Sequence, residues 1–123
     1  MINGTKVICL CGSTRFTVEM SNIIWNYAKQ GILALGWCIL LSNHEGGGKE
    51  IDHHLAEQEG VAEVLDELHL RKIDIADEVF IVNVNGYIGD GTKREIRYAI
   101  THGKPLKFLE PDWGYPDLAD VLT

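Results

Sequence analysis

The sequence has few basic residues, few cysteines and no long apolar run. Eleven Lys and Arg stand against eighteen Asp and Glu, which gives the 123-residue chain a net charge of −7. So acidic a chain lacks the basic face that neutralises nucleic acid phosphates, and we expect no nucleic acid polymer as a partner. The longest apolar runs, 7–11 and 38–41, are far too short to cross a bilayer, so we expect no membrane association.

The cysteines are too few to form a disulfide framework. All three lie in apolar, strand-like runs (Cys9, Cys11 and Cys38), and three cannot all pair within the chain. Cys9 and Cys11 would share one face of a strand, because side chains alternate along it. We interpret the cysteines as buried, reduced thiols. Since no secretion signal follows Met1, the sequence predicts a cytoplasmic protein.

The length and the apolar content (46%) indicate one folded domain over residues 1–123. Apolar runs predict strands at 5–11, 32–41, 78–84 and 105–109. Apolar residues at helical spacing predict helices over 16–27, 61–73 and 92–100. The polar segment 43–58 is expected to be a mobile loop, with a lid over a ligand as one interpretation. This order predicts an α/β fold, a small doubly wound Rossmann-like parallel sheet of about four or five strands with helices on both faces.

Ligands of open α/β sheets bind beyond the carboxyl ends of the strands, so we expect segments 12–15, 42–48 and 83–95 to meet there. The first of them, Gly12-Ser13-Thr14-Arg15, offers free amides, two hydroxyls and a guanidinium to an anion such as phosphate. The alternative is that Ser13 or Thr14 only caps the following helix. The segment is neither the dinucleotide glycine fingerprint nor a P-loop.

The third segment carries two acids with open interpretations. Glu95 follows Thr92 by three residues, so the two residues could form a helix capping box. Alternatively, Glu95 at the ligand end of the sheet is placed to work as a nucleophile. Asp90 could be a second acid, or a turn residue before Gly91.

Residues 76–99 read A-D-E-V-F-I-V-N-V-N-G-Y-I-G-D-G-T-K-R-E-I-R-Y-A and resemble the core of the nucleoside 2-deoxyribosyltransferase superfamily, which includes nucleoside 5′-monophosphate N-glycosidases. The shared pattern is Ala-Asp, an apolar strand, a loop and then D-G-(S/T)-x-x-E. The start Gly-Ser-Thr-Arg is similar to the loop that receives the 5′-phosphate in the monophosphate hydrolase branch.

The resemblance implies that Glu95 attacks C1′ of the sugar, expels the base and forms a glycosyl ester that water or a second base resolves. It implies that Ser13 and Arg15 hold phosphate, and that Asp90 and Tyr87 lie near the base or sugar. The candidate catalytic residues are therefore Glu95 and Asp90. The candidate substrate-binding residues are Gly12, Ser13, Thr14, Arg15, His69, Asn83, Tyr87 and Arg97.

Three positions depart from the family's pattern. His69 stands where the family has an acid, Arg97 where it usually has glycine, and Gly89 where the transferases have another acid. A side branch of the family is therefore expected, acting on a nucleoside or a nucleoside 5′-monophosphate. The alternatives are a nucleotide-binding or sensing module without turnover, and an interaction domain in which Glu95 only caps a helix.

The resemblance also implies a homodimer or higher homo-oligomer, with the tail around Trp113 as a candidate contact. We expect no cofactor and no metal. His44, His53 and His54 match no common metal-site spacing.

Overall fold

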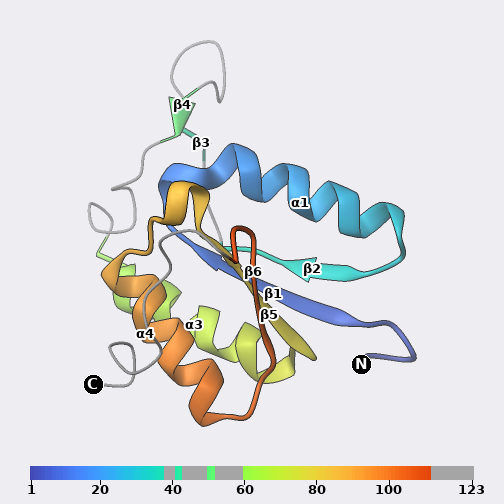
Figure 1. Cartoon of the computed structure of the whole chain (residues 1–123). Helices are drawn as coiled ribbons and strands as arrows, with labels where there is room; N and C mark the ends of the chain where they lie inside the picture. The colour runs from blue at the N-terminus through green and yellow to red at the C-terminus, as the bar shows by residue number, and fades with distance from the viewer. Residues whose placement is uncertain (38–40, 43–49, 52–59, 112–123) are drawn as a thin grey trace.

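The computed structural model describes residues 1–37, 41–42, 50–51 and 60–111 (Figure 1). The predictions made for the loop 43–58, its histidines, Cys38 and the tail from residue 112 therefore lie outside the described residues, except where residues 50 and 51 form a strand.

Four strands form one parallel sheet in the described part of the chain. They are β1 (Val7–Gly12), β2 (Leu33–Leu35), β5 (Glu78–Val82) and β6 (Leu106–Phe108). Their order is β2-β1-β5-β6, so β1 lies between β2 and β5. Two shorter strands, β3 (Leu41–Ser42) and β4 (Glu50–Ile51), pair with each other in an antiparallel ladder.

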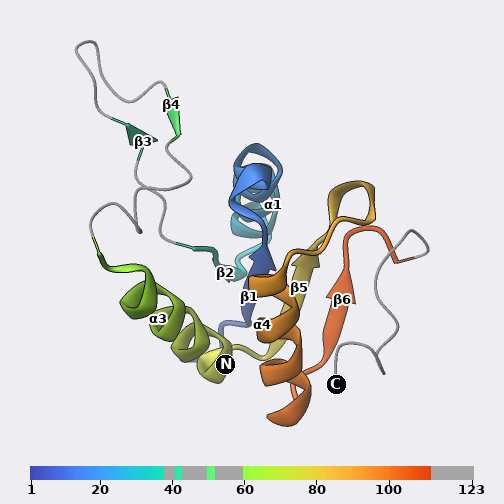
Figure 2. The ribbon, with the colours of Figure 1, turned by 90° about the vertical axis from the view of Figure 1, so that its left-hand side faces the viewer.

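Helices cover both faces of the parallel sheet, which confirms the predicted doubly wound α/β architecture. Helix α1 (Thr17–Lys29) lies on one face, and helices α3 (Ala62–Ile75) and α4 (Asp90–Thr101) lie on the other (Figures 1 and 2). None of the helices in the described residues is long and apolar enough to cross a membrane.

Alternation along β1 supplies both apolar layers. Ile8 and Leu10 pack in the layer beneath α1, together with Met20 of that helix. Cys9 and Cys11 point to the opposite face, into the layer that α3 and α4 cover. All six residues of β1 are buried, as expected of a central strand in a sheet with two covered faces.

Several boundaries differ from the predicted ones. Strand β2 is Leu33–Leu35 rather than the predicted 32–41, and Gly36 and Trp37 lie outside it. A short 3-10 helix, η1 (Thr14–Phe16), precedes α1, and another, η2 (Val84–Gly86), follows β5. Helix α4 begins at Asp90 rather than at Thr92, which changes the interpretation of Glu95.

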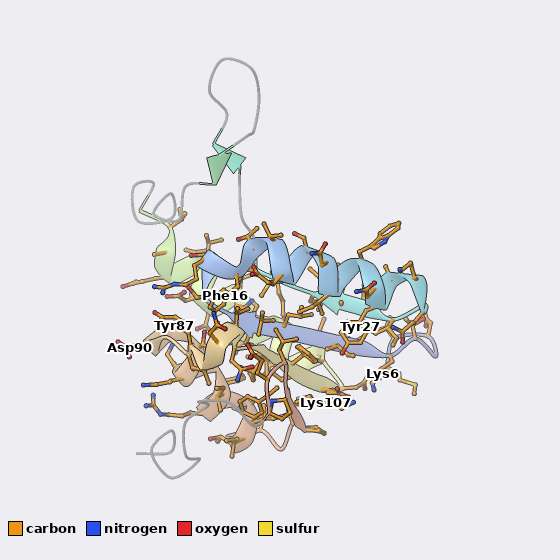
Figure 3. All side chains as sticks on the ribbon, turned by 45° about the horizontal axis from the view of Figure 1, so that its top comes forward. Lys6, Phe16, Tyr27, Tyr87, Asp90 and Lys107 are labelled. Carbon is orange, nitrogen blue, oxygen red and sulfur yellow. The ribbon has the colours of Figure 1, made fainter. Side chains whose placement is uncertain are left out.

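The amino end of the sheet is held by ion pairs and is distant from the ligand end. Glu78 is buried, and its carboxylate oxygens lie 3.0 Å from Lys6 Nζ and 3.1 Å from Lys107 Nζ. Asp77 accepts a hydrogen bond from the Val7 backbone N–H (2.8 Å), a structural role. Figure 3 shows Lys6 and Lys107 at one end of the molecule, and Phe16, Tyr87 and Asp90 at the other.

Gly12 ends β1 where the strand runs too close to β5 for a side chain. A Cβ atom at Gly12 would lie 2.9 Å from the backbone oxygen of Val82, whereas one at Gly91, in the first turn of α4, would meet no atom within 4 Å.

We predict that Gly12→Ala lowers the free energy of unfolding by about 1–3 kcal/mol. Gly91→Ala should leave it unchanged or raise it by about 0.4–1 kcal/mol. Urea denaturation measures both variants, and equal stability of the two would contradict the close approach.

Candidate functional site

A pocket of about 230 Å³ opens at the carboxyl end of the sheet. It lies where α1 leaves β1 for one face and α4 follows β5 on the other, the position at which doubly wound sheets bind ligands. Its lining combines the end of β1, the start of α4 and single residues from two other segments: Gly12, Ser13, Thr14, Trp37, Asp66, Gly89, Gly91, Thr92, Arg94 and Glu95. The predicted meeting of segments 12–15 and 83–95 is therefore confirmed. The third segment, 42–48, lies outside the residues whose side chains are described.

Two interactions fix the walls of this pocket. The indole N–H of Trp37 donates a hydrogen bond to the backbone oxygen of Gly12 (2.7 Å), which holds the ring against the end of β1. Arg94 of α4 and Asp66 of α3 form an ion pair across the outer rim (3.2 Å). Because both partners are half exposed, this pair positions the rim more than it stabilises the fold.

Glu95 is buried because it occupies a core-facing position of α4. Thr92, Glu95, Ile96 and Ala99 are the buried residues of this helix, and they recur at the spacing of one helix face. The residue that caps the helix is Gly89, and it makes no side-chain capping bond. Thr92 lies inside the first turn, so of the two interpretations of Glu95 the Thr92–Glu95 capping box is wrong. Glu95 is 7% exposed and lines the pocket.

A cluster of titratable side chains lies behind Glu95. His69 of α3 is 3% exposed, and its Nε2 lies 3.9 Å from Glu95 Oε2. The same nitrogen lies 3.6 Å from Cys9 Sγ and 3.5 Å from Cys11 Sγ. We call Cys9, Cys11, His69 and Glu95 the buried cluster. Its sulfur and imidazole atoms are the described groups that could hold a metal ion.

Burial raises the pKa of Glu95 to about 7, and the positive charge of His69 opposes the rise. Burial by itself would lower the pKa of His69, but a hydrogen bond with Cys9 and the charge of Glu95 outweigh it and raise that pKa. Hydrogen bonding to Cys11 lowers the pKa of Cys9 to about 6, while the same bond and burial raise the pKa of Cys11. The Cys9 thiol therefore ionises more readily than a free thiol, and the Cys11 thiol ionises less readily.

Arg15 and Tyr87 lie beside the pocket. The guanidinium of Arg15 stacks over the Tyr87 ring, 3.9 Å from its centroid. Phe16 meets the same ring edge-on (Figure 3). A Cβ atom at Gly89, which lines the pocket, would lie 3.3 Å from the Tyr87 hydroxyl. An exposed cation and a half-exposed phenol thus stand next to the pocket.

The structure brings some of the predicted site residues together and leaves others apart. Ser13 lines the pocket, and its hydroxyl also accepts a hydrogen bond from the Arg15 backbone N–H (3.3 Å), so the predicted capping interaction is present in η1. Asn83 is fully buried, and its amide exchanges hydrogen bonds of 3.1 and 3.0 Å with the backbone of Glu110, which anchors the chain after β6.

Six predicted residues are not among those that line the pocket. They are Arg15 and Tyr87, which lie beside it, and His69, Asn83, Asp90 and Arg97. Asp90 is exposed as the first residue of α4, and Arg97 is half-buried in the next turn. His69 lies one layer deeper, behind Glu95, and so contacts a catalytic candidate rather than open space.

Sequence reasoning missed Cys9 and Cys11 as neighbours of Glu95, and it missed Trp37, Asp66 and Arg94 as lining residues. The alternation of β1 did place both thiols on one face, and helical spacing could have placed His69 and Glu95 on core-facing stripes. Nothing local indicates that these stripes meet on the same stretch of β1, because that depends on where α3 and α4 cross the sheet.

Comparisons of the chain with protein-family models, with curated proteins and with solved structures gave no match. No matched protein therefore assigns a role to the residues of the pocket. A buried carboxyl group on the wall of a pocket can act as a nucleophile, as a general base or as a general acid, according to its protonation.

The raised pKa of Glu95 makes the stability of the fold depend on pH. A group whose pKa is raised on folding contributes stability below its unfolded value, here near 4.5, and loses it as pH rises through the folded value of about 7. We predict that Glu95→Gln raises the free energy of unfolding by about 1–3 kcal/mol more at pH 8 than at pH 5, because the amide carries no charge at either pH.

Urea denaturation at both pH values, in buffer with a metal chelator, measures this difference. Glu63→Gln, an exposed glutamate in the first turn of α3, is the matched control and should show no such difference. An equal effect of Glu95→Gln at the two pH values would show that Glu95 is charged throughout this range.

Proposed function

We propose that the protein cleaves the N-glycosidic bond of a nucleoside or a nucleoside 5′-monophosphate, with Glu95 as the nucleophile. The observation that supports this best is a buried carboxyl group on the wall of a pocket at the ligand end of a doubly wound sheet. The resemblance of residues 76–99 to the nucleoside 2-deoxyribosyltransferase superfamily supports it independently, since the position of the family's catalytic glutamate is Glu95.

In this mechanism the ionised Glu95 carboxylate attacks C1′ of the sugar. A bond forms between C1′ and the carboxylate oxygen as the bond to the base breaks, and the base leaves with the bonding electrons and takes up a proton. Water then attacks C1′, which releases the sugar with retained configuration and regenerates the carboxylate. A second base in place of water would give transfer. We favour hydrolysis, because the sequence Gly12-Ser13-Thr14-Arg15 resembles the phosphate-binding loop of the monophosphate hydrolase branch.

His69 supports the ionised form of Glu95 in this proposal. Its Nε2 lies 3.9 Å from Glu95 Oε2, so a protonated imidazole stabilises the carboxylate that attack requires. His69 is thus a positioning residue for Glu95. Because it is buried and does not line the pocket, it does not contact the substrate itself.

Arg15 is the residue we assign to the 5′-phosphate. Its exposed guanidinium stands over Tyr87 beside the pocket, and Ser13 and Thr14 add hydroxyls to the wall. A charge-assisted hydrogen bond from arginine is the usual device for holding a phosphate. The Tyr87 ring, about two-fifths exposed, offers a surface for the sugar or base.

A second subunit would complete the site. The pocket that the described residues form has a volume of about 230 Å³, below the range of about 300–1,000 Å³ common for enclosed ligand sites, so a nucleotide needs walls beyond these residues. We therefore propose a cytoplasmic homodimer, as the resemblance implies. Exposed apolar residues on α1 and α3 offer surfaces for contact: Trp25, Val64 and Leu68.

A nucleotide-binding module without turnover is the second candidate. The raised pKa of Glu95 favours it, because a protonated carboxyl group is not a nucleophile. Turnover distinguishes the two functions, since both need the same pocket.

We predict that the wild-type protein releases free base from a nucleoside or a nucleoside 5′-monophosphate, and that Glu95→Gln lowers the rate by roughly 10³-fold or more, as expected when a nucleophile is lost. Chromatography of free base after incubation with a panel of ribo- and deoxyribonucleosides and their monophosphates measures this. Glu63→Gln should keep the wild-type rate. Absence of release, combined with thermal stabilisation by a nucleotide, would favour the binding module. Absence of both would contradict both functions.

For a monophosphate substrate, Arg15→Gln should raise KM by about 10- to 100-fold, the cost of one charge-assisted hydrogen bond, with a smaller effect on kcat. The matching nucleoside should show little change, because it carries no phosphate. Arg71→Gln is the control, because Arg71 forms ion pairs with Glu67 and Asp74 of its own helix α3. Equal effects of Arg15→Gln on nucleoside and monophosphate would contradict the phosphate assignment.

A further inference from the structure

We propose that Cys9, Cys11 and His69 form a binding site for a thiophilic transition metal ion such as Zn²⁺, because their two sulfur atoms and one imidazole nitrogen converge in the layer between β1 and helix α3. This site differs from the one considered in the sequence, whose histidines at 44, 53 and 54 lie outside the described residues.

The two sulfur–nitrogen distances suit a tetrahedral ion. His69 Nε2 lies 3.6 Å from Cys9 Sγ and 3.5 Å from Cys11 Sγ. With Zn–S near 2.3 Å and Zn–N near 2.0–2.1 Å, a tetrahedral site places sulfur and nitrogen about 3.5 Å apart. The three donor atoms all lie within 4.8 Å of one another, so one ion could contact all of them.

Hydrogen bonds alone do not account well for this arrangement. Both thiols approach the same ring nitrogen, which in neutral imidazole has either one lone pair or one proton. It can therefore accept from only one thiol at a time. The other ring nitrogen, Nδ1, is buried and has no hydrogen-bond partner among the described residues. A metal ion would use the lone pairs of all three donors at once.

The three ligands are carried by a strand and a helix of the fold. Cys9 and Cys11 are two residues apart on the central strand and are fully buried, so their side chains leave the same face. His69 lies on α3 one turn before Ile73, which is also fully buried in this layer. A site built on a strand and a helix in this way keeps its geometry better than one built on loops.

Charge balance and access also favour the site. Two thiolates neutralise a divalent ion, so the complex can be buried at less cost than a separate charge. The ion would displace the thiol protons of Cys9 and Cys11 on binding. Glu95 links the cluster to the outside, since it lies 3.9 Å from His69 and lines the pocket. Its carboxylate or water is the candidate for the fourth ligand.

This inference does not rest on the proposed function, and its test does not use turnover. The full-length protein is treated with a chelator and titrated with Co²⁺, which reports tetrahedral thiolate ligands by intense visible bands and a near-ultraviolet charge-transfer band. Competition with Zn²⁺ then shows whether Zn²⁺ takes the same site. Mass spectrometry under non-denaturing conditions gives the stoichiometry.

We expect one Co²⁺ per chain, displaced by Zn²⁺, with the charge-transfer band of thiolate ligands. Cys11→Ser and His69→Gln should each weaken binding at least tenfold and change the spectrum, whereas Cys38→Ser and His102→Gln, the matched cysteine and histidine controls, should bind as the wild type does. His102 is an exposed residue at the end of α4.

Two results would overturn the site. One is a wild-type protein that shows no thiolate charge-transfer band with Co²⁺ present in excess. The other is binding that Cys38→Ser abolishes and that Cys11→Ser leaves intact. Because the first result is read from the wild type, it holds even if a core variant fails to fold, which circular dichroism of each variant checks.

Discussion

Helix α4 places a carboxyl group in the apolar layer beneath it, and the organisation of the candidate site follows from that burial. Glu95 lies next to Ile96 in a layer formed by residues such as Ile73 and Ile81. A buried carboxylate without partners is costly, so the group either keeps its proton or finds a positive neighbour. In this fold both occur, since its pKa is raised and His69 lies 3.9 Å away.

The sheet topology determines what this buried group can reach. Because the chain leaves β1 and β5 toward opposite faces, the segments that follow the two strands diverge and leave room beyond the sheet. Gly12 lets the strands stay close up to that point, and the indole of Trp37 closes one side. Glu95 therefore has an apolar layer and two thiols behind it and an open pocket in front.

The two proposals concern opposite sides of one cluster. The glycosidase uses the pocket side, where the Glu95 carboxylate meets a ligand, and the metal site uses the inner side, where Cys9, Cys11 and His69 face one another. His69 belongs to both. Its single Nε2 would stabilise the Glu95 carboxylate when protonated and would bind a metal ion only when deprotonated. The protonation state of the imidazole therefore decides which of these two roles His69 can fill.

The sequence by itself determined the fold class, because apolar runs and helical spacing are local properties that each segment carries alone. It also determined that Gly12, Ser13 and Glu95 would come together, since the carboxyl ends of parallel strands share one edge. Only the tertiary structure decided that Glu95 is buried rather than a helix cap, because this depends on where α4 begins and on the face that it turns to the sheet. The meeting of His69 with Cys9 and Cys11 was likewise decided by the packing of α3 across β1, which joins residues about sixty positions apart. Contacts at that separation depend on how whole elements are oriented, and no local pattern encodes that orientation.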